Sequence, residues 1–370
     1  MSPTSYRTAP PRGGQEYDGA TGPPAEGDGV SLATQIPKIH LHCHLEGSLR
    51  PATFVEFARE QGLPLRYRPD GSSDGIAEEV DPAEPYHFES FRDFLYGFAA
   101  VNRTLSTPER FARLAREFAQ EARAQNVVYG ELFISPSVWA FFHPELDVRA
   151  TLRDIVAELH AGGEGRFQLI VDLTRNFGAE SALATARLAA ELAADGVIGI
   201  GLGGDESRFP PELFVESFDY ARAAGLHCVA HAGEAAGPRS VRDAVELLHA
   251  ERIGHGITAL QDDAVVRLLR ENGIPLEVCP TSNDRTGAAL SNGDAFQRFD
   301  DSGCVVVIDA DDPPMFGTTI EREYARVEAA CGPQTLLRFV RNAVEGSFAD
   351  ADLKRQLRAL LPPDVGPPAG

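Results

Sequence analysis

Three histidines stand at alternate positions in residues 39–47, which read IHLHCHLEG. The chain has only 10 histidines in 370 residues, so this cluster indicates a function. Side chains two positions apart on a strand point the same way, with Cα atoms roughly 6.6 Å apart. Neighbours in the series can therefore bind one metal ion, but the first and third cannot both reach it. We expect His42 and His44 to be ligands and His40 to be a hydrogen-bonded core residue one layer lower.

Further polar side chains follow other apolar runs. His231 begins the sequence HAGE, which ends at Glu234, and the pair Asp311 and Asp312 follows another run. Adjacent carboxylates buried there need a partner, such as a cation or a substrate. Three imidazoles and one carboxylate suit zinc better than magnesium or calcium. Because zinc lowers the pKa of a bound water to about 7, these residue types predict metal-assisted hydrolysis.

Short β-rich runs alternate with helical patterns between residues 37 and 312. The runs are PKIHLHCH, VVYGELFISP, FQLIVDLT, VIGIGLGG, LHCVAHAG, RIGHGI, IPLEVCP and CVVVIDAD. Residues 108–125 carry an apolar stripe typical of a helix, which Thr107 can cap. Eight strands with interposed helices predict an α/β fold, a (β/α)8 TIM-type barrel with a helical insertion after strand 1. An open doubly wound sheet is the second choice, although no GxGxxG fingerprint follows a strand.

A parallel barrel brings the carboxyl ends of all its strands to one rim. The polar residues at the ends of the predicted strands would therefore converge, although they are far apart in the sequence. They include His42, His44, His231, His255 and Asp311.

The whole chain carries 34 basic and 55 acidic residues, a net charge of −21. This balance argues against binding to nucleic acid or to an anionic membrane. Residues 1–34, rich in Pro and Gly, predict a disordered tail, and residues 361–370 a flexible one. One catalytic domain would span residues 35–360. Five cysteines without paired spacing, with no signal peptide and no apolar span, predict a cytoplasmic protein.

Six segments, in this order, resemble the adenosine deaminase family of the amidohydrolase superfamily: PKIHLHCHLEGS, GIGLGGDES, HAGE, RIGHGI, CPTSN and DADDPPMFGTT. The resemblance runs from residue 37 to beyond residue 316. The separate signature of zinc cytidine deaminases, H-x-E with P-C-x-x-C, is absent from the sequence. The resemblance implies one zinc ion per chain and hydrolysis of a 6-aminopurine to a 6-oxopurine, with release of ammonia.

The resemblance also implies a role for each motif residue. Glu234 would protonate the purine nitrogen N1, and His255 would orient the attacking water and stabilise the developing oxyanion. Asp312 would contact purine N7, and the backbone amide of Gly204 would contact N3. The implied zinc ligands are His42, His44, His231 and Asp311.

Some positions depart from the family pattern. His40 stands where many members have glutamate, and Asp309 adds an acid near the metal. Glu46 stands where nucleoside deaminases have an aspartate that binds a sugar hydroxyl, and in this it resembles adenine deaminases. In contrast, CPTSN followed by Thr-Gly-Ala resembles the nucleoside enzymes. We give the longer segment more weight and predict adenosine or a 5′-modified adenosine, with Glu46 on a loop at the rim facing the sugar.

Other interpretations stay open at this point. The substrate could be free adenine or aminodeoxyfutalosine, and the chain could be a catalytically silent purine-binding barrel. A phosphotriesterase-like site would need a strand-end lysine, and the sequence has none. The phenylalanines of residues 86–98 match a core-facing helix, which we prefer to a lid over the base. The sequence predicts a small-molecule partner and no particular oligomeric state.

Overall fold

The computed structural model describes residues 31–67, 81–88, 90–163, 166–288 and 294–363. Eight strands form one parallel sheet in sequential order. They are β1 (Lys38–His44), β2 (Val127–Ile134), β3 (Arg166–Thr174), β4 (Val197–Gly203), β5 (His227–Ala232), β6 (Arg252–His255), β7 (Leu276–Val278) and β8 (Val306–Ile308). The eight runs predicted from the sequence therefore coincide with the eight strands of the structure, and the (β/α)8 barrel is confirmed.

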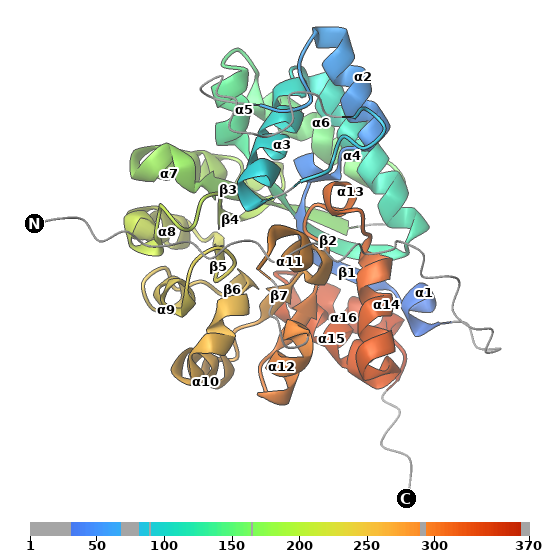
Figure 1. The fold of residues 1–370 in the computed structure, drawn as a ribbon, viewed down its shortest axis with the longest axis vertical. Helices are drawn as coiled ribbons and strands as arrows, with labels where there is room; N and C mark the ends of the chain where they lie inside the picture. The colour runs from blue at the N-terminus through green and yellow to red at the C-terminus, as the bar shows by residue number, and fades with distance from the viewer. Residues whose placement is uncertain (1–30, 68–80, 89, 164–165, 289–293, 364–370) are drawn as a thin grey trace, which may run out of the picture. The chain divides into compact units, whose positions relative to one another are not determined.

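Helices lie around the strands, as Figure 1 shows for α7, α8, α9 and α10. The α-helices are α1 (Leu32–Gln35), α2 (Pro51–Gln61), α3 (Phe91–Thr104), α4 (Pro108–Ala124), α5 (Pro136–Phe142), α6 (Val148–His160), α7 (Gly178–Glu191), α8 (Val215–Ala223), α9 (Pro238–Glu246), α10 (Asp263–Asn272), α11 (Pro280–Thr286), α12 (Ala295–Asp301), α13 (Pro313–Phe316), α14 (Ile320–Cys331), α15 (Pro333–Gly346) and α16 (Ala351–Leu360). The 3-10 helices are η1 (Glu46–Ser48), η2 (Arg175–Phe177), η3 (Ala193–Asp195), η4 (Pro211–Phe214) and η5 (Ile257–Gln261).

The barrel closes where the chain leaves β8 and meets β1. The backbone N–H of His44 donates to the carbonyl of Asp311 at 3.0 Å, and the N–H of Asp311 donates to the carbonyl of His42 at 3.1 Å. These bonds place Asp311 directly beside the histidine strand. The closure of the barrel thus brings three of the predicted ligands together.

The chain between β1 and β2 carries the predicted helical insertion, here η1, α2, α3 and α4. Helix α4 covers nearly all of the predicted range, and its apolar stripe is buried. Thr107 stands at its N-cap position, but its side chain makes no capping hydrogen bond, contrary to our expectation. The extended conformation of Thr107 and the proline that follows it begin this helix instead.

The predicted tails are shorter than expected where the structure describes them. Residues 31–34, assigned to the N-terminal tail, include part of α1, and Glu328 accepts hydrogen bonds from the N–H groups of Leu32 and Ala33 at 3.0 and 2.9 Å. At the other end, the carbonyl of Pro362 accepts from Arg341 at 2.7 Å. Residues 1–30 and 364–370 lie outside the described part, so the rest of this prediction stays a prediction.

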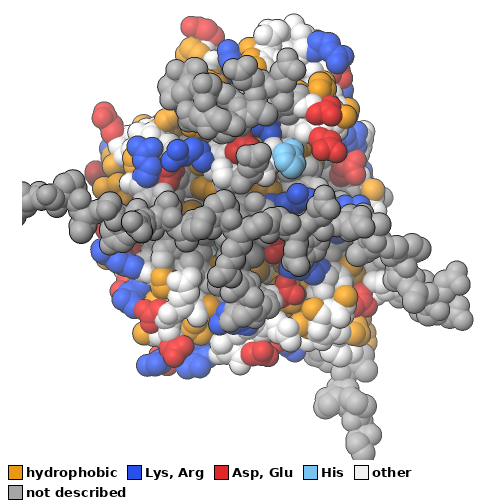
Figure 2. All heavy atoms as spheres, viewed as in Figure 1, with side chains coloured by type: hydrophobic (Ala, Val, Ile, Leu, Met, Phe, Trp, Pro, Cys, Tyr) orange, Lys and Arg blue, Asp and Glu red, His pale blue; other side chains and the backbone are white. Residues whose placement is uncertain are grey.

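On the face seen in Figure 2, acidic and basic side chains lie interspersed among the described residues. Among the described helices, none is both long and apolar enough to cross a membrane.

Candidate active site

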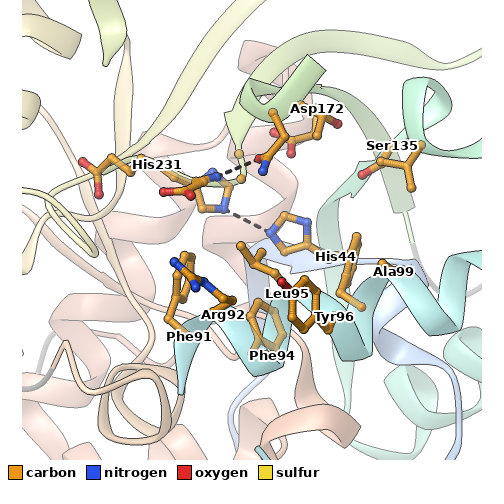
Figure 3. A pocket seen from close by; sticks show the side chains of 18 of the residues that line it. His44, Phe91, Arg92, Phe94, Leu95, Tyr96, Ala99, Ser135, Asp172 and His231 are labelled. Atoms are coloured by element: carbon orange, nitrogen blue, oxygen red, sulfur yellow. Dashed lines mark hydrogen bonds between the residues drawn. The ribbon is translucent and has the colours of Figure 1, made fainter. Parts of the chain in front are cut away.

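A cavity of about 390 Å³ opens at the carboxyl ends of the strands. Figure 3 shows His44 and His231 in its wall, with residues of α3 facing them. Seven of the site residues predicted from the sequence line this cavity: His44, Gly204, His231, Glu234, His255, Asp311 and Asp312. Most of the predicted site therefore lies in one place.

Four imidazoles surround the carboxylate of Asp311. Potential ligand atoms of His42, His231, His255 and Asp311 all lie within 4.8 Å of one another, and a second such group joins His44 to Asp311 and Asp312. Both groups share Asp311, so they form one cluster. The four predicted ligands are divided between the groups.

The potential donor atoms of these four predicted ligands are nevertheless separated by short distances. The Oδ1 atom of Asp311 lies 3.4 Å from Nε2 of His42 and 3.4 Å from Nε2 of His44. The Nε2 atoms of His44 and His231 are 3.1 Å apart. Ligand atoms on a tetrahedral ion with bonds of about 2.0–2.1 Å lie roughly 3.3 Å apart. These spacings therefore suit one divalent ion.

Hydrogen bonding of His42 also fits a metal. Its Nδ1 lies 2.8 Å from the Glu277 carboxylate, whereas its buried Nε2 has no hydrogen-bond partner in the described structure. Carboxylates hold the far nitrogen of metal-binding histidines in this way. A cation would complete the unsatisfied nitrogen.

Burial keeps most of these imidazoles neutral. It lowers the pKa of His44 to about 3 and that of His255 to about 4, although Asp311 opposes both shifts. Burial also lowers the pKa of His231 well below its usual value. Burial opposes charge on His42 too, but the neighbouring carboxylates of Asp311 and Glu277 outweigh it and raise the pKa of His42. A cation bound between Nε2 of His42 and Asp311 would take the place of this proton, while Glu277 keeps its bond to Nδ1.

Glu234 lies beside His255, with its Oε2 3.6 Å from Nε2 of the imidazole and its side chain 9% exposed. Burial raises the pKa of Glu234, and the charges of Asp311 and Glu206 add to the effect. The carboxyl therefore holds a proton at higher pH than an exposed glutamate does. Such a group can donate a proton to a buried base.

The turn that carries Glu234 is held by another carboxylate. Glu206 accepts hydrogen bonds from the four successive backbone N–H groups of residues 233–236, at 2.6, 3.1, 2.8 and 3.0 Å. Four donors on one carboxylate fix the path of this segment. Glu206, which also lines the cavity, thus positions Glu234 through the backbone of this turn.

Backbone strain accompanies two site residues. His255 and Asp311 have φ of 62° and 63°, in the left-handed region that L-residues rarely adopt. The imidazole of His255 is also held by Asn283, whose Nδ2 lies 2.9 Å from Nδ1. Because an amide N–H donates to Nδ1, the proton of the ring is on Nε2, the nitrogen that faces Glu234.

Asp312 and Gly204 face the cavity as expected. Asp312 is almost fully buried, and its Oδ1 has no hydrogen-bond partner in the described chain. A Cβ at Gly47 would lie 1.6 Å from that oxygen, so only glycine leaves room for the carboxyl. Gly204 has φ of 100°, which a side chain would disfavour.

The predicted position of Glu46 was wrong. Its side chain is fully buried and is not part of the cavity wall. Its Oε1 accepts from the N–H of Ser135 at 2.7 Å and from the indole of Trp139 at 2.6 Å, while Oε2 has no described partner. Burial raises its pKa to about 7. Glu46 lies behind the wall because η1 follows β1 at once, where we expected an open loop.

The phenylalanines of α3 do more than pack. Phe91, Phe94 and Phe98 line the cavity, and Figure 3 shows Phe91 and Phe94 facing the histidines. The preferred interpretation as plain core packing was therefore incomplete. Phe94 serves both purposes, since it is 8% exposed and its ring also contacts Phe316.

His40 belongs to neither group of potential ligands among the described residues. It is buried, and burial lowers its pKa to about 3. It lies in the core as expected, and its Nε2 has no hydrogen-bond partner among the described residues. The extra acid Asp309 is also buried, accepts from the N–H of Leu41 at 2.7 Å, and has its pKa raised to about 7 by burial and then by Glu277.

Sequence reasoning missed several supporting residues. Ser282 donates to Oδ2 of Asp311 at 2.6 Å, and Asp172 lines the cavity with its pKa raised to about 8, chiefly by burial. Glu277 and Asp172 each interrupt an apolar strand, in LEV and LIVDLT, and such an interruption was the signal available. Ser282 and Asn283 belong to the CPTSN segment, but no role was assigned to them.

Comparison with known proteins gives a consistent result. The adenosine deaminase family model matches residues 37–362. The chain belongs to the adenosine deaminase family. It is therefore a hydrolytic deaminase of the amidohydrolase superfamily, acting on a C–N bond.

Individual relatives are similar over nearly their whole length. An aminodeoxyfutalosine deaminase of Streptomyces avermitilis is 37% identical over 340 residues, covering 90% of this chain and 92% of the relative. An adenine deaminase of Agrobacterium fabrum is 34% identical over 345 residues, covering 89% and 99%. A solved amidohydrolase from Burkholderia ambifaria, with bound Zn, has a TM-score of 0.78 at 26% identity, covering 90% of this chain and 93% of that one.

Proposed function

We propose that the protein is a zinc-dependent hydrolase that deaminates a 6-aminopurine nucleoside, either adenosine or a 5′-modified adenosine. The observation that carries this proposal is the buried cluster around Asp311 with the proton-holding carboxyl of Glu234 beside it. The zinc bound to the similar Burkholderia amidohydrolase supports the choice of metal.

One ion per chain would be held by His42, His44, His231 and Asp311. When bound, a divalent cation lowers the pKa of water and so supplies a nucleophile at neutral pH. Imidazole nitrogens with one carboxylate are the donor set that zinc prefers. The distances of 3.1–3.4 Å between these donors support the assignment.

Side chains of the protein then transfer the protons of the reaction and orient the water. Glu234 donates to purine N1 as the water oxygen adds to C6, and His255 orients that water through its Nε2 proton. One proton of the water returns to Glu234, and the other passes to the C6 amino group. The C6–N bond then breaks, ammonia leaves, and the C6–O bond becomes the carbonyl of the 6-oxopurine. Asp312 would bind N7 and the N–H of Gly204 would bind N3, which fixes the ring against the metal cluster.

The extent of the cavity supports a substrate larger than a free base. Besides the histidine cluster, its wall includes four aromatic residues: Tyr67, the α5 residues Phe141 and Phe142, and Phe177 of η2. A sugar with an apolar or aromatic 5′ substituent would fill the part of the cavity that these residues line. Glu46, being buried, would act on the sugar only through the Ser135 and Trp139 segment that it holds.

Adenine is the second candidate substrate, because Glu46 resembles adenine deaminases and several relatives carry that name. Ammonia release from adenine, adenosine, a 5′-substituted adenosine and aminodeoxyfutalosine separates the two. We expect the highest kcat/KM for a nucleoside and poor turnover of adenine. The highest kcat/KM for adenine would reject the nucleoside assignment. Tight binding without turnover of any of them would instead indicate a silent purine-binding barrel.

A further inference from the structure

A buried ion network lies inside the barrel below the metal cluster. Arg252, at the start of β6, is 1% exposed and lies between two carboxylates. Its Nε is 2.5 Å from Oε1 of Glu277 on β7, and its Nη2 is 2.6 Å from Oε2 of Glu131 on β2. Strands β2 and β6 are on opposite sides of the barrel. The guanidinium therefore crosses the interior and connects the two sides.

The second oxygen of Glu277 points from this network to the metal cluster. Its Oε2 lies 2.8 Å from Nδ1 of His42. Because a carboxylate accepts, Nδ1 of His42 carries a proton, and the neutral ring therefore has its lone pair on Nε2. That nitrogen lies 3.4 Å from Oδ1 of Asp311 and is otherwise unpartnered in the described structure. Glu277 thus sets both the tautomer and the direction of a predicted ligand.

The segment after α15 closes over the other side of Arg252. The ring of Phe348 lies 3.8 Å from the guanidinium carbon and stacks on His227 with centroids 4.0 Å apart. The N–H of Phe348 donates to Oε1 of Glu131 at 2.6 Å, and the carbonyl of Gly346 accepts from Arg252 at 3.1 Å. These contacts remove the guanidinium from water and leave it little freedom to turn.

We propose that Arg252 and Glu277 are positioning residues for metal binding, which hold the imidazole of His42 ready for the ion before the ion arrives. Glu131 has a different part, since it balances and anchors Arg252 but does not contact His42. This inference rests on the proposed metal site and not on the purine reaction. Partners of this kind typically contribute 10–100-fold to metal affinity.

The test compares two variants, each of which removes one of the two carboxylate charges that pair with Arg252. In Glu277→Gln, the amide cannot accept from both His42 and Arg252, whereas Glu131→Gln leaves the bond between Glu277 and His42 intact. The zinc Kd of the metal-depleted full chain is measured by competition with a chromophoric chelator, and the melting temperature of each unloaded protein is measured in parallel. Nitrogen chemical shifts of His42 in the unloaded protein, recorded across a pH series up to the range in which its ring is neutral, report its tautomer.

We expect Glu277→Gln to weaken zinc binding at least tenfold relative to Glu131→Gln and to mix the His42 tautomers. Glu131→Gln should stay within threefold of the parent, even if both variants lose similar thermal stability. A ratio below tenfold between the two variants would overturn the proposal. If Glu277→Gln does not fold, Glu277→Asp, which withdraws the carboxylate by one methylene, is judged by the same criterion. A parent chain that binds no zinc would reject the metal site itself, and this inference with it.

Discussion

Buried charges are arranged differently at the two ends of the barrel interior. These ends are the rim, at the carboxyl ends of the strands, and the floor, where Arg252 lies. At the floor, Arg252 forms ion pairs with Glu131 and Glu277 at 2.5–2.6 Å. At the rim, Nε2 of His42 stays 3.4 Å from its nearest carboxylate, Asp311, and Oδ1 of Asp312 has no hydrogen-bond partner among the described residues. The rim also holds the strained backbone of Asp311 and His255. Paired charges stabilise a fold, whereas unpaired and strained groups persist where a ligand completes them.

The first prediction concerns the rim, where substitution should remove activity and preserve the fold. Glu234→Gln keeps the shape of the side chain but cannot deliver a proton, so kcat should fall at least 100-fold. Because the change removes a carboxyl whose ionisation is disfavoured by burial, stability should be unchanged or higher. Ammonia release and zinc content are measured on the same sample. More than about a tenth of the parent activity would mean that Glu234 is not the proton donor.

At the floor, the same kind of change should instead destabilise the fold. Arg252→Met leaves Glu131 and Glu277 buried without their cation, which should reduce the free energy of unfolding by about 3–5 kcal/mol. Arg338→Met is the control, because Arg338 pairs with Asp300 at the surface and should contribute less than about 1 kcal/mol. Denaturant unfolding of both variants decides the point. An equal loss of unfolding free energy in the two variants would contradict the contrast between the buried ion pairs of the floor and the surface pair.

Glu206 offers an intermediate case, a rim residue with its hydrogen bonds satisfied. Glu206→Gln exchanges a charged acceptor of four backbone N–H groups for a neutral one, so the turn carrying Glu234 should loosen. We expect kcat to fall about 10–100-fold, since small displacements of a reacting group have effects of this size. Zinc affinity should stay within threefold. A parallel loss of zinc would assign Glu206 to the metal site instead.

The smallest effect should come from Asp172, a buried acid of the cavity wall. Its folded-state pKa of about 8 exceeds the ordinary value of 3.8, so the folded chain binds the extra proton between these pH values. Stability that depends on this proton is therefore lost as pH rises towards 8. Asp172→Asn should remove that slope and add about 1–3 kcal/mol at pH 8, and less at pH 5. Unfolding of the metal-depleted proteins at both pH values measures it, and a pH-independent difference would contradict the assignment.

The sequence was sufficient for those features that depend on local pattern and topology. Apolar runs located all eight strands, and the common rim of a parallel barrel brought His231 and Asp311 to His42. It was insufficient where a side chain meets a partner on a remote element. Glu277 meets Arg252 and His42 from two other strands, and no spacing rule encodes that contact.

Glu46 shows the same limit at the rim. Its direction depends on η1, a turn of 3-10 helix that starts directly after β1 and aims the carboxyl at Trp139, 93 residues further along the chain. A motif position alone predicted a substrate contact. The local backbone decided the outcome.

Zinc reconstitution tests the central claim most directly. Metal-depleted protein is titrated with zinc, and ammonia release from the best nucleoside of the panel is recorded against zinc added per chain. The account predicts no activity without metal and a linear rise that ends at one zinc per chain, because His42, His44, His231 and Asp311 form a single set of ligands. Activity in the metal-free protein, or a rise that continues to two zinc ions per chain, would contradict it.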